Sequence, residues 1–173
     1  MIKRGLVVSG AALLMACTPP ASETPPTAEI PPPNLASGCN AQASRDMSVV
    51  GSQYYLIEAE TVGDVCADAT ATMRIRSRDG VELFSRNYQV SQVSLAFNPN
   101  GDRVSIRTDL EAWTENTSQS GRTDELPAWP AGAQRPPGFE PVVSRNQYEA
   151  ARGAQGALFC FPDGGESNAC VAL

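Results

Sequence analysis

Four cysteines follow residue 38, and they limit the folds open to this chain more than any other feature. An even number of cysteines in a small domain predicts two disulfides, for which four cysteines allow three pairings. We favour the two sequence-local pairs, because LFCFPDGGESNACVA predicts two short strands around a Pro-Asp-Gly-Gly turn. Zinc binding and thiol redox chemistry are alternatives that lack support, since the chain has neither histidine nor a CxxC motif. The favoured disulfides are Cys39–Cys66 and Cys160–Cys170.

The first sixteen residues have the pattern of a secretory signal. Two basic residues precede an apolar run that is too short for a membrane-spanning helix, which needs roughly 20 apolar residues. The segment LMAC, residues 14–17, resembles the lipobox of bacterial lipoproteins. That resemblance implies cleavage before Cys17, lipid on its sulfur and, because Thr18 follows instead of aspartate, sorting to the outer membrane. The alternative is an ordinary signal peptide in which Cys17 has no role.

A proline-rich tether is predicted between the lipid anchor and the folded part. Residues 18–38 contain seven prolines and no aromatic side chain, so they cannot bury enough apolar surface to offset chain entropy. We therefore expect a signal peptide over residues 1–16, a lipidated tether over 17–38 and one globular domain over 39–173.

The composition restricts the chemistry of this domain. Histidine is absent and Lys3 is the only lysine, so the usual Ser-His-Asp, Cys-His, His-zinc and Schiff-base machinery is excluded. An enzyme would depend on carboxylates and tyrosines; we lean against catalysis and expect no cofactor and no metal. Loss of Lys3 and Arg4 with the signal leaves 11 basic and 19 acidic residues, a net charge near −8. This charge disfavours nucleic acid as a partner.

A hairpin is predicted over residues 70–90, where Asp79-Gly80 gives a strong turn signal. A three-residue loop with Gly80 at positive φ keeps the apolar residues of both strands on one face. The predicted cross-strand neighbours are Ile75 with Leu83 and Arg76 with Glu82.

The remaining elements complete a mainly β prediction, a small antiparallel sheet or barrel with one or two short helices. Residues 107–116 fit either a strand or a helix, because Thr108 and Glu111 match a capping box. The other predicted elements are a strand over residues 52–61, a second hairpin over 93–106 with its turn at 99–101, a proline-rich loop over 126–143, a helix over 145–152 and strands over 158–173.

Three arginines alternate along one predicted strand. Arg74, Arg76 and Arg78 would share a face and could bind phosphate or carboxylates. The simpler interpretation, which we prefer, is a solvated face on which Glu82 pairs with Arg76.

Two carboxylate pairs suggest glycan chemistry. Same-face neighbours on a strand lie roughly 6.5–7 Å apart, which overlaps the carboxylate separation of inverting glycosidases. The pairs are Glu58 with Glu60 and Asp109 with Glu111, and Trp113 beside the second pair could stack on a sugar. Catalytic carboxylates normally face each other across a cleft, however, whereas these would stand side by side.

Trp129 is the first candidate for a partner contact. It lies between prolines in PAWP, where it either forms an exposed anchor for a partner or folds back onto the core. Asp163, Glu166 and Asn168 offer oxygens for calcium, but the spacing of an EF-hand is absent.

The combined prediction is a non-enzymatic lipoprotein that faces the periplasm from the outer membrane. Its acidic domain would bind a periplasmic protein or a cell-wall component. The alternative is a carboxylate-dependent glycan hydrolase or lectin-like peptidoglycan binder that uses Asp109, Glu111 and Trp113.

Overall fold

A computed structural model of the chain describes residues 38–49, 53–118 and 121–173, without the side chains of residues 47–49. The predicted signal peptide, the lipidation site Cys17 and, apart from Gly38, the tether lie outside the described residues. The described part is mainly β, with two antiparallel sheets and two α-helices. Neither sheet closes into a barrel within these ranges, so the open-sheet form of the predicted fold class is the one adopted.

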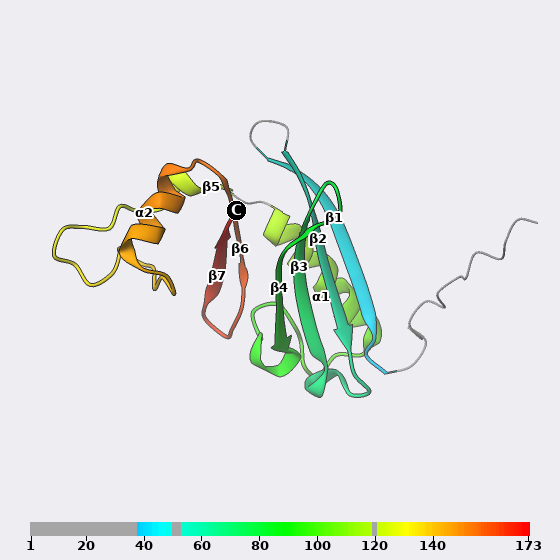
Figure 1. Ribbon diagram of the computed structural model, residues 1–173. Helices are drawn as coiled ribbons and strands as arrows, with labels where there is room; N and C mark the ends of the chain where they lie inside the picture. The colour runs from blue at the N-terminus through cyan, green and yellow to red at the C-terminus, as the bar shows by residue number, and fades with distance from the viewer. Residues whose placement is uncertain (1–37, 50–52, 119–120) are drawn as a thin grey trace, which may run out of the picture. The chain divides into compact units, whose positions relative to one another are not determined.

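The larger sheet has four antiparallel strands in sequential order, and helix α1, Arg103–Ser118, packs on its first two strands (Figure 1). Each strand pairs with the next in the chain, as expected for short turn-linked strands. The strands are β1, Ala41–Val49; β2, Gln53–Val62; β3, Thr70–Ser77; and β4, Glu82–Gln89.

The smaller sheet has three strands in the order β5-β6-β7, and helix α2, Arg145–Gly153, lies in the connection between β5 and β6. The predicted helix over residues 145–152 is confirmed, and Ser144 and Gln147 form its capping box. The strands are β5, Gly121–Arg122; β6, Ala157–Pro162; and β7, Asn168–Ala172. Three short 3₁₀ turns complete the described part: η1, Cys66–Asp68; η2, Val90–Gln92; and η3, Thr123–Glu125.

One large core joins the four-stranded sheet, α1 and β6. Alternate residues of β2 and β3, such as Ile57 and Ile75, are fully buried because strand side chains alternate between the two faces. Trp113 of α1 is 1% exposed, and its ring meets those of Tyr88 and Phe161 edge-to-face at 5.8 and 5.9 Å. Burial of these large apolar surfaces is the main stabilising contribution.

The hairpin over residues 70–90 is confirmed in outline and corrected in register. Gly80 has φ +80° and Arg76 pairs with Glu82, as predicted. A register shift between Ile75 and Arg76 then places Phe84 opposite Ile75, so the predicted pairing of Ile75 with Leu83 is wrong. The bulge turns the larger aromatic ring of Phe84 towards Phe161, with ring centroids 5.8 Å apart, and leaves Leu83 41% exposed.

The second predicted hairpin is wrong, because its second strand is the start of α1. Asp102 caps this helix: its Oδ1 accepts from the Ser105 amide at 2.9 Å, and the Asp102 amide donates to Ser105 Oγ at 3.2 Å. Ile106 and Leu110 then fall on one buried helical face. Residues 107–116 are therefore helical, and the helix begins before Thr108, the start that we considered.

Both favoured disulfide pairings are confirmed. Cys39 joins Cys66 beside the large core, and Cys160 joins Cys170 between the paired strands β6 and β7. The Pro-Asp-Gly-Gly turn brings the second pair together, as the sequence predicted.

Candidate functional site

The outer face of the four-stranded sheet, opposite the buried side chains of Ile57 and Ile75, carries an ion-pair network. Glu60 Oε1 lies 2.5 Å from Arg74 Nη2, and Glu58 Oε2 lies 2.7 Å from Arg76 Nε. Glu82 Oε2 lies 3.8 Å from Arg74 Nε and 3.6 Å from Arg76 Nη2. The hydrogen bond that Arg74 donates to the Glu60 carboxylate is the main reason that the pKa of Arg74 is raised. Both arginines are thus matched by carboxylates, and Glu58 and Glu60 do not form a free acid–base pair.

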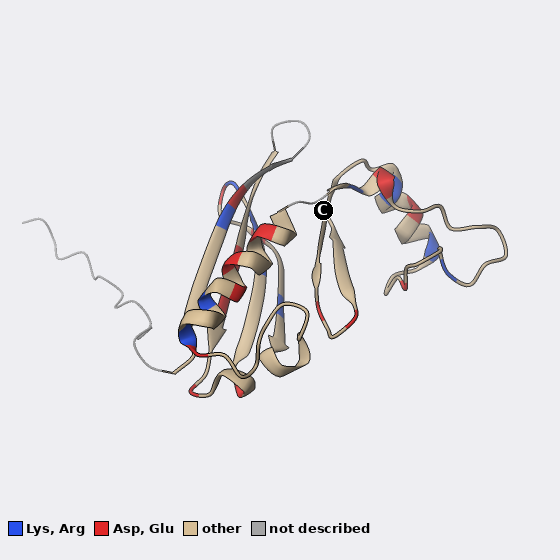
Figure 2. Cartoon of the chain, turned by 180° about the vertical axis from the view of Figure 1, so that it is seen from behind, with Lys and Arg blue, Asp and Glu red and all other residues tan. Residues whose placement is uncertain are grey.

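A polar hollow of about 600 Å³ adjoins this network. On α1, Arg107 and Glu111 contribute an ion pair of 3.1 Å to its lining. The other lining residues are Gln42, Ala43, Ser44, Glu58, Ala59, Glu60, Arg74 and Arg76. Charged residues of both signs recur along α1 (Figure 2), so this region offers mixed charge.

Helix formation separates the residues of the glycan-hydrolase alternative. Asp109 and Glu111 are two positions apart on α1, so their side chains diverge by roughly 200° around the helix axis. Asp109 Oδ2 accepts from a loop amide at 3.0 Å, and Glu111 pairs with Arg107. Trp113 is buried and donates from Nε1 to the Pro162 carbonyl at 3.0 Å, so it cannot stack on a sugar. The arrangement predicted for a strand, with Asp109, Glu111 and Trp113 on one face, is therefore wrong.

Trp129 is half-buried and fastens the proline-rich loop to α2. Its ring meets Tyr148 edge-to-face at 5.6 Å, and its amide donates to Glu149 Oε1 at 2.9 Å. Its Nε1 donates to the Ala133 carbonyl at 3.0 Å, across the turn of the loop. The Trp129 carbonyl in turn accepts from Arg145 Nη2 at 2.7 Å. Trp129 therefore folds back onto the structure, as one of its two predicted roles requires, but it packs against α2 rather than the main core.

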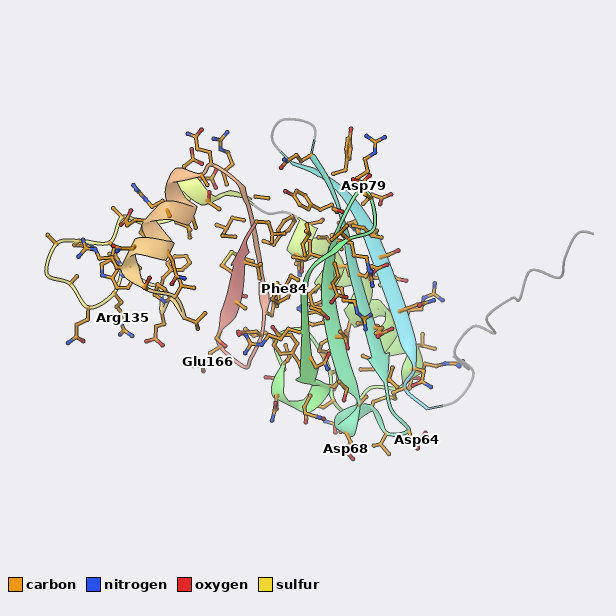
Figure 3. All side chains as sticks on the ribbon, in the orientation of Figure 1. Asp64, Asp68, Asp79, Phe84, Arg135 and Glu166 are labelled. Atoms are coloured by element: carbon orange, nitrogen blue, oxygen red, sulfur yellow. A yellow bond between two sulfur atoms is a disulfide. The ribbon has the colours of Figure 1, made fainter. Side chains whose placement is uncertain are left out.

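The rest of this loop presents apolar side chains to solvent. In one turn of the loop, the Phe139 amide donates to the Pro136 carbonyl at 3.3 Å. Residues 140–143, the last of the loop, follow this turn. Val142 there is fully exposed, and its neighbour Val143 is also exposed. Arg135, labelled in Figure 3, lies on the same loop and forms an ion pair with Glu140. Val142 was not among the predicted contact residues, although its place after a proline within a loop is a usable signal.

Two buried oxygen atoms lie where β4 approaches the β6–β7 turn. The Tyr88 hydroxyl and Asp163 Oδ1 have no hydrogen-bond partner among the described residues. Burial raises the pKa of Tyr88 to about 12, an effect that Arg86 opposes and Asp163 reinforces. Asp163, Glu166 and Asn168, the calcium candidates, all belong to this hairpin, but the described ranges contain no group of three or more His, Cys, Asp or Glu residues arranged for a metal.

A second hollow, of about 480 Å³, lies beside the β3–β4 turn. The sequence did not predict this hollow, because the alternation of arginines places Arg78 in one stripe with Arg74 and Arg76. Its lining residues are Asp46, Tyr54, Tyr55, Leu56, Ser77, Arg78 and Gly80.

Three comparisons with known proteins were made. No family model, no curated protein and no solved structure matches it. No helix in the described ranges is both long and apolar enough to cross a membrane. Any functional assignment depends on the residues and their geometry.

Proposed function

We propose that this chain is a lipoprotein of the outer membrane whose domain binds a periplasmic partner protein and catalyses no reaction. The LMAC segment supports the lipid anchor, and the proline-rich tether supports a domain held away from the bilayer. The two disulfides agree with an oxidising compartment.

The observation that carries the proposal is an apolar surface on a well-fastened loop. Val142 is 100% exposed, in a loop that Trp129 and α2 hold through several side-chain hydrogen bonds. Fixing a loop before binding lowers the entropy cost of ordering it in a complex. We infer that Val142 and Val143 contact the partner and that Trp129 positions them.

The chemistry of the loop indicates the kind of partner. Its contact residues are small, branched and apolar, and Arg135 and Glu140 form an ion pair beside them. A shallow apolar groove with a polar rim would complement this surface. The partner is thus a protein with such a groove rather than a highly charged polymer.

Site-specific photocrosslinking in the cells that make this protein tests the proposal. The full chain would carry p-benzoylphenylalanine in place of Val142, and the matched control would carry it in place of Val104, which is 70% exposed on α1. We expect a protein adduct at position 142 that is absent at 104 and weakened by Trp129→Ala.

Two results would contradict the proposal. Equal adducts at both positions would indicate non-specific collision. Adducts at position 142 that contain muropeptides instead of a protein would assign the loop to the cell wall.

A further inference from the structure

The three arginines that alternate along β3 and its turn have different surroundings. Arg74 and Arg76 each contact two carboxylates on the outer face. Arg78 makes no ion pair with any residue that the structure describes. The neighbouring segment over residues 47–52, MSVVGS, contains no acidic residue that could supply one. The guanidinium of Arg78 is therefore the one of these three that still lacks an anion.

Arg78 is exposed and its side chain contacts an aromatic ring. Its guanidinium carbon lies 5.6 Å from the ring centroid of Tyr54, a distance typical of a cation–π contact. Tyr55 pairs with Ser77, so one step further along the same antiparallel register sets Tyr54 beside Arg78. Tyr54 remains 46% exposed, which leaves part of its side chain open to a ligand. The turn that follows is marked by Asp79 in Figure 3.

Apolar and polar groups converge in the hollow of about 480 Å³ beside this pair. The side chains of Tyr54 and Leu56 share one face of β2 and give the hollow apolar walls, and Gly80 adds no side chain to obstruct it. Asp46 places a carboxylate in the same lining as the Arg78 guanidinium. A purely anionic ligand would be repelled by Asp46, whereas a ligand with both a carboxylate and an N–H donor would be matched by both groups.

We propose that this hollow binds the carboxyl-terminal end of a peptide. The terminal carboxylate accepts two hydrogen bonds from Arg78, in the bidentate geometry that guanidinium groups favour. The last side chain packs on Tyr54 and Leu56, and Asp46 accepts from a peptide N–H. This site is separate from the proline-rich loop and does not depend on the function proposed for it.

Binding of matched peptides to the full chain, purified in detergent, tests the site by calorimetry. The probes are acetyl-Ala-Phe as the free acid and as the amide, which differ only in the terminal charge. We expect the acid to bind about tenfold more tightly than the amide, as a charge-assisted hydrogen-bond pair provides. Arg78→Gln should abolish this preference, and Tyr54→Ala should weaken both peptides.

Arg86→Gln is the matched control. The Arg86 guanidinium also lies over a tyrosine ring, 5.4 Å from that of Tyr88, and makes no ion pair with a described residue. This variant should keep the preference for the acid. Equal affinity for acid and amide, or equal loss in both arginine variants, would overturn the proposal.

A third peptide distinguishes the natural sources of such an end. Acetyl-D-Ala-D-Ala represents the wall peptide, and acetyl-Ala-Phe represents the end of a protein. Either stereochemical preference, if it depends on Arg78, supports recognition of a carboxyl terminus. Crosslinking at Val142 tests a different surface, so failure of one experiment does not imply failure of the other.

Discussion

The sheet with α1 and the proline-rich loop with α2 are held together by different interactions. The first shares a core that includes Trp113, Ile57 and Phe159, each almost fully buried. The second has a small cluster in which only Leu126, Tyr148 and Leu158 are buried.

In the proline-rich loop, side chains donate hydrogen bonds to carbonyls that lack a backbone donor. Proline has no N–H, so a segment with five prolines over residues 126–143 leaves carbonyls without a backbone donor. Tyr148 donates to the Pro127 carbonyl at 2.8 Å, and Arg152 donates to the Leu126 carbonyl at 3.0 Å. Apolar burial therefore stabilises the core, whereas a few hydrogen-bond donors on α2 stabilise the loop.

The largest effect should come from the shared core. Trp113→Ala removes a buried ring that meets three other aromatic rings, at 5.0 to 5.9 Å, and should lower the free energy of unfolding by about 3–5 kcal/mol. Urea titration followed by circular dichroism measures this loss. Trp113→Phe is the control and should cost less, because it keeps an aromatic ring. A loss below about 1 kcal/mol in Trp113→Ala would refute the role given to the core.

Removing each disulfide compares the two regions directly. Cys39–Cys66 lies in the large core and spans 27 residues, whereas Cys160 packs against the small cluster and its bridge spans 10. Loop-closure entropy gives about 3.5 kcal/mol for the first and about 2.7 kcal/mol for the second. We expect the Cys39→Ser/Cys66→Ser variant to melt at the lower temperature of the two. The reverse order would mean that the hairpin contributes more than its size suggests.

A local effect is expected in the loop. Trp129→Ala removes one aromatic contact and one hydrogen bond to the Ala133 carbonyl, about 1–2 kcal/mol of local stability. Limited proteolysis should therefore cut faster within residues 130–143, while the urea midpoint of the whole domain hardly moves. A matching fall in the urea midpoint would show that the loop and the core unfold together.

The smallest expected effect is a difference in unfolding free energy between two variants of buried tyrosines. Tyr148→Phe should cost about 1 kcal/mol at neutral pH, because the Pro127 carbonyl loses its donor. Tyr88→Phe should cost almost nothing there, since its hydroxyl has no described partner.

At alkaline pH, the titration of Tyr88 should change the free energy of unfolding. Burial raises its pKa to about 12, so the folded state keeps a proton that the unfolded chain releases near pH 10. The stability contributed by this group is complete below pH 10 and is lost as the pH rises towards 12. The wild-type unfolding free energy should fall over this range more steeply than that of Tyr88→Phe, and parallel curves would contradict the assignment.

Local signals in the sequence predicted the local features correctly. The Cys160–Cys170 disulfide, the Ser144 capping box and the turn at Gly80 depend on residues close in sequence. The start of α1 was missed because Val104 and Ile106 alternate as in a strand, although Asp102 caps the helix. Only packing decides that Ile106 is buried while Val104 is exposed.

For the candidate sites too, the sequence predicted what is set within one strand and missed what depends on the pairing of strands. Alternation predicted that Arg74, Arg76 and Arg78 share one stripe, and it predicted the contact between Arg76 and Glu82. Alternation could not predict that Glu58 and Glu60, both on β2, form ion pairs with these first two arginines. That outcome depends on the register between strands, which spacing within one strand does not contain.

The disulfide at the start of the domain also determines how mechanical tension would pass through it. If the proposed anchor and a partner at the loop pull against each other, force enters at Cys39 and crosses directly to Cys66 through the covalent bridge. The chain between them, which includes β1 and β2, lies outside this covalent path. Tension on the tether would therefore leave β1 and β2 paired. The hollow beside Tyr54 would then keep the residues that β2 contributes to its lining.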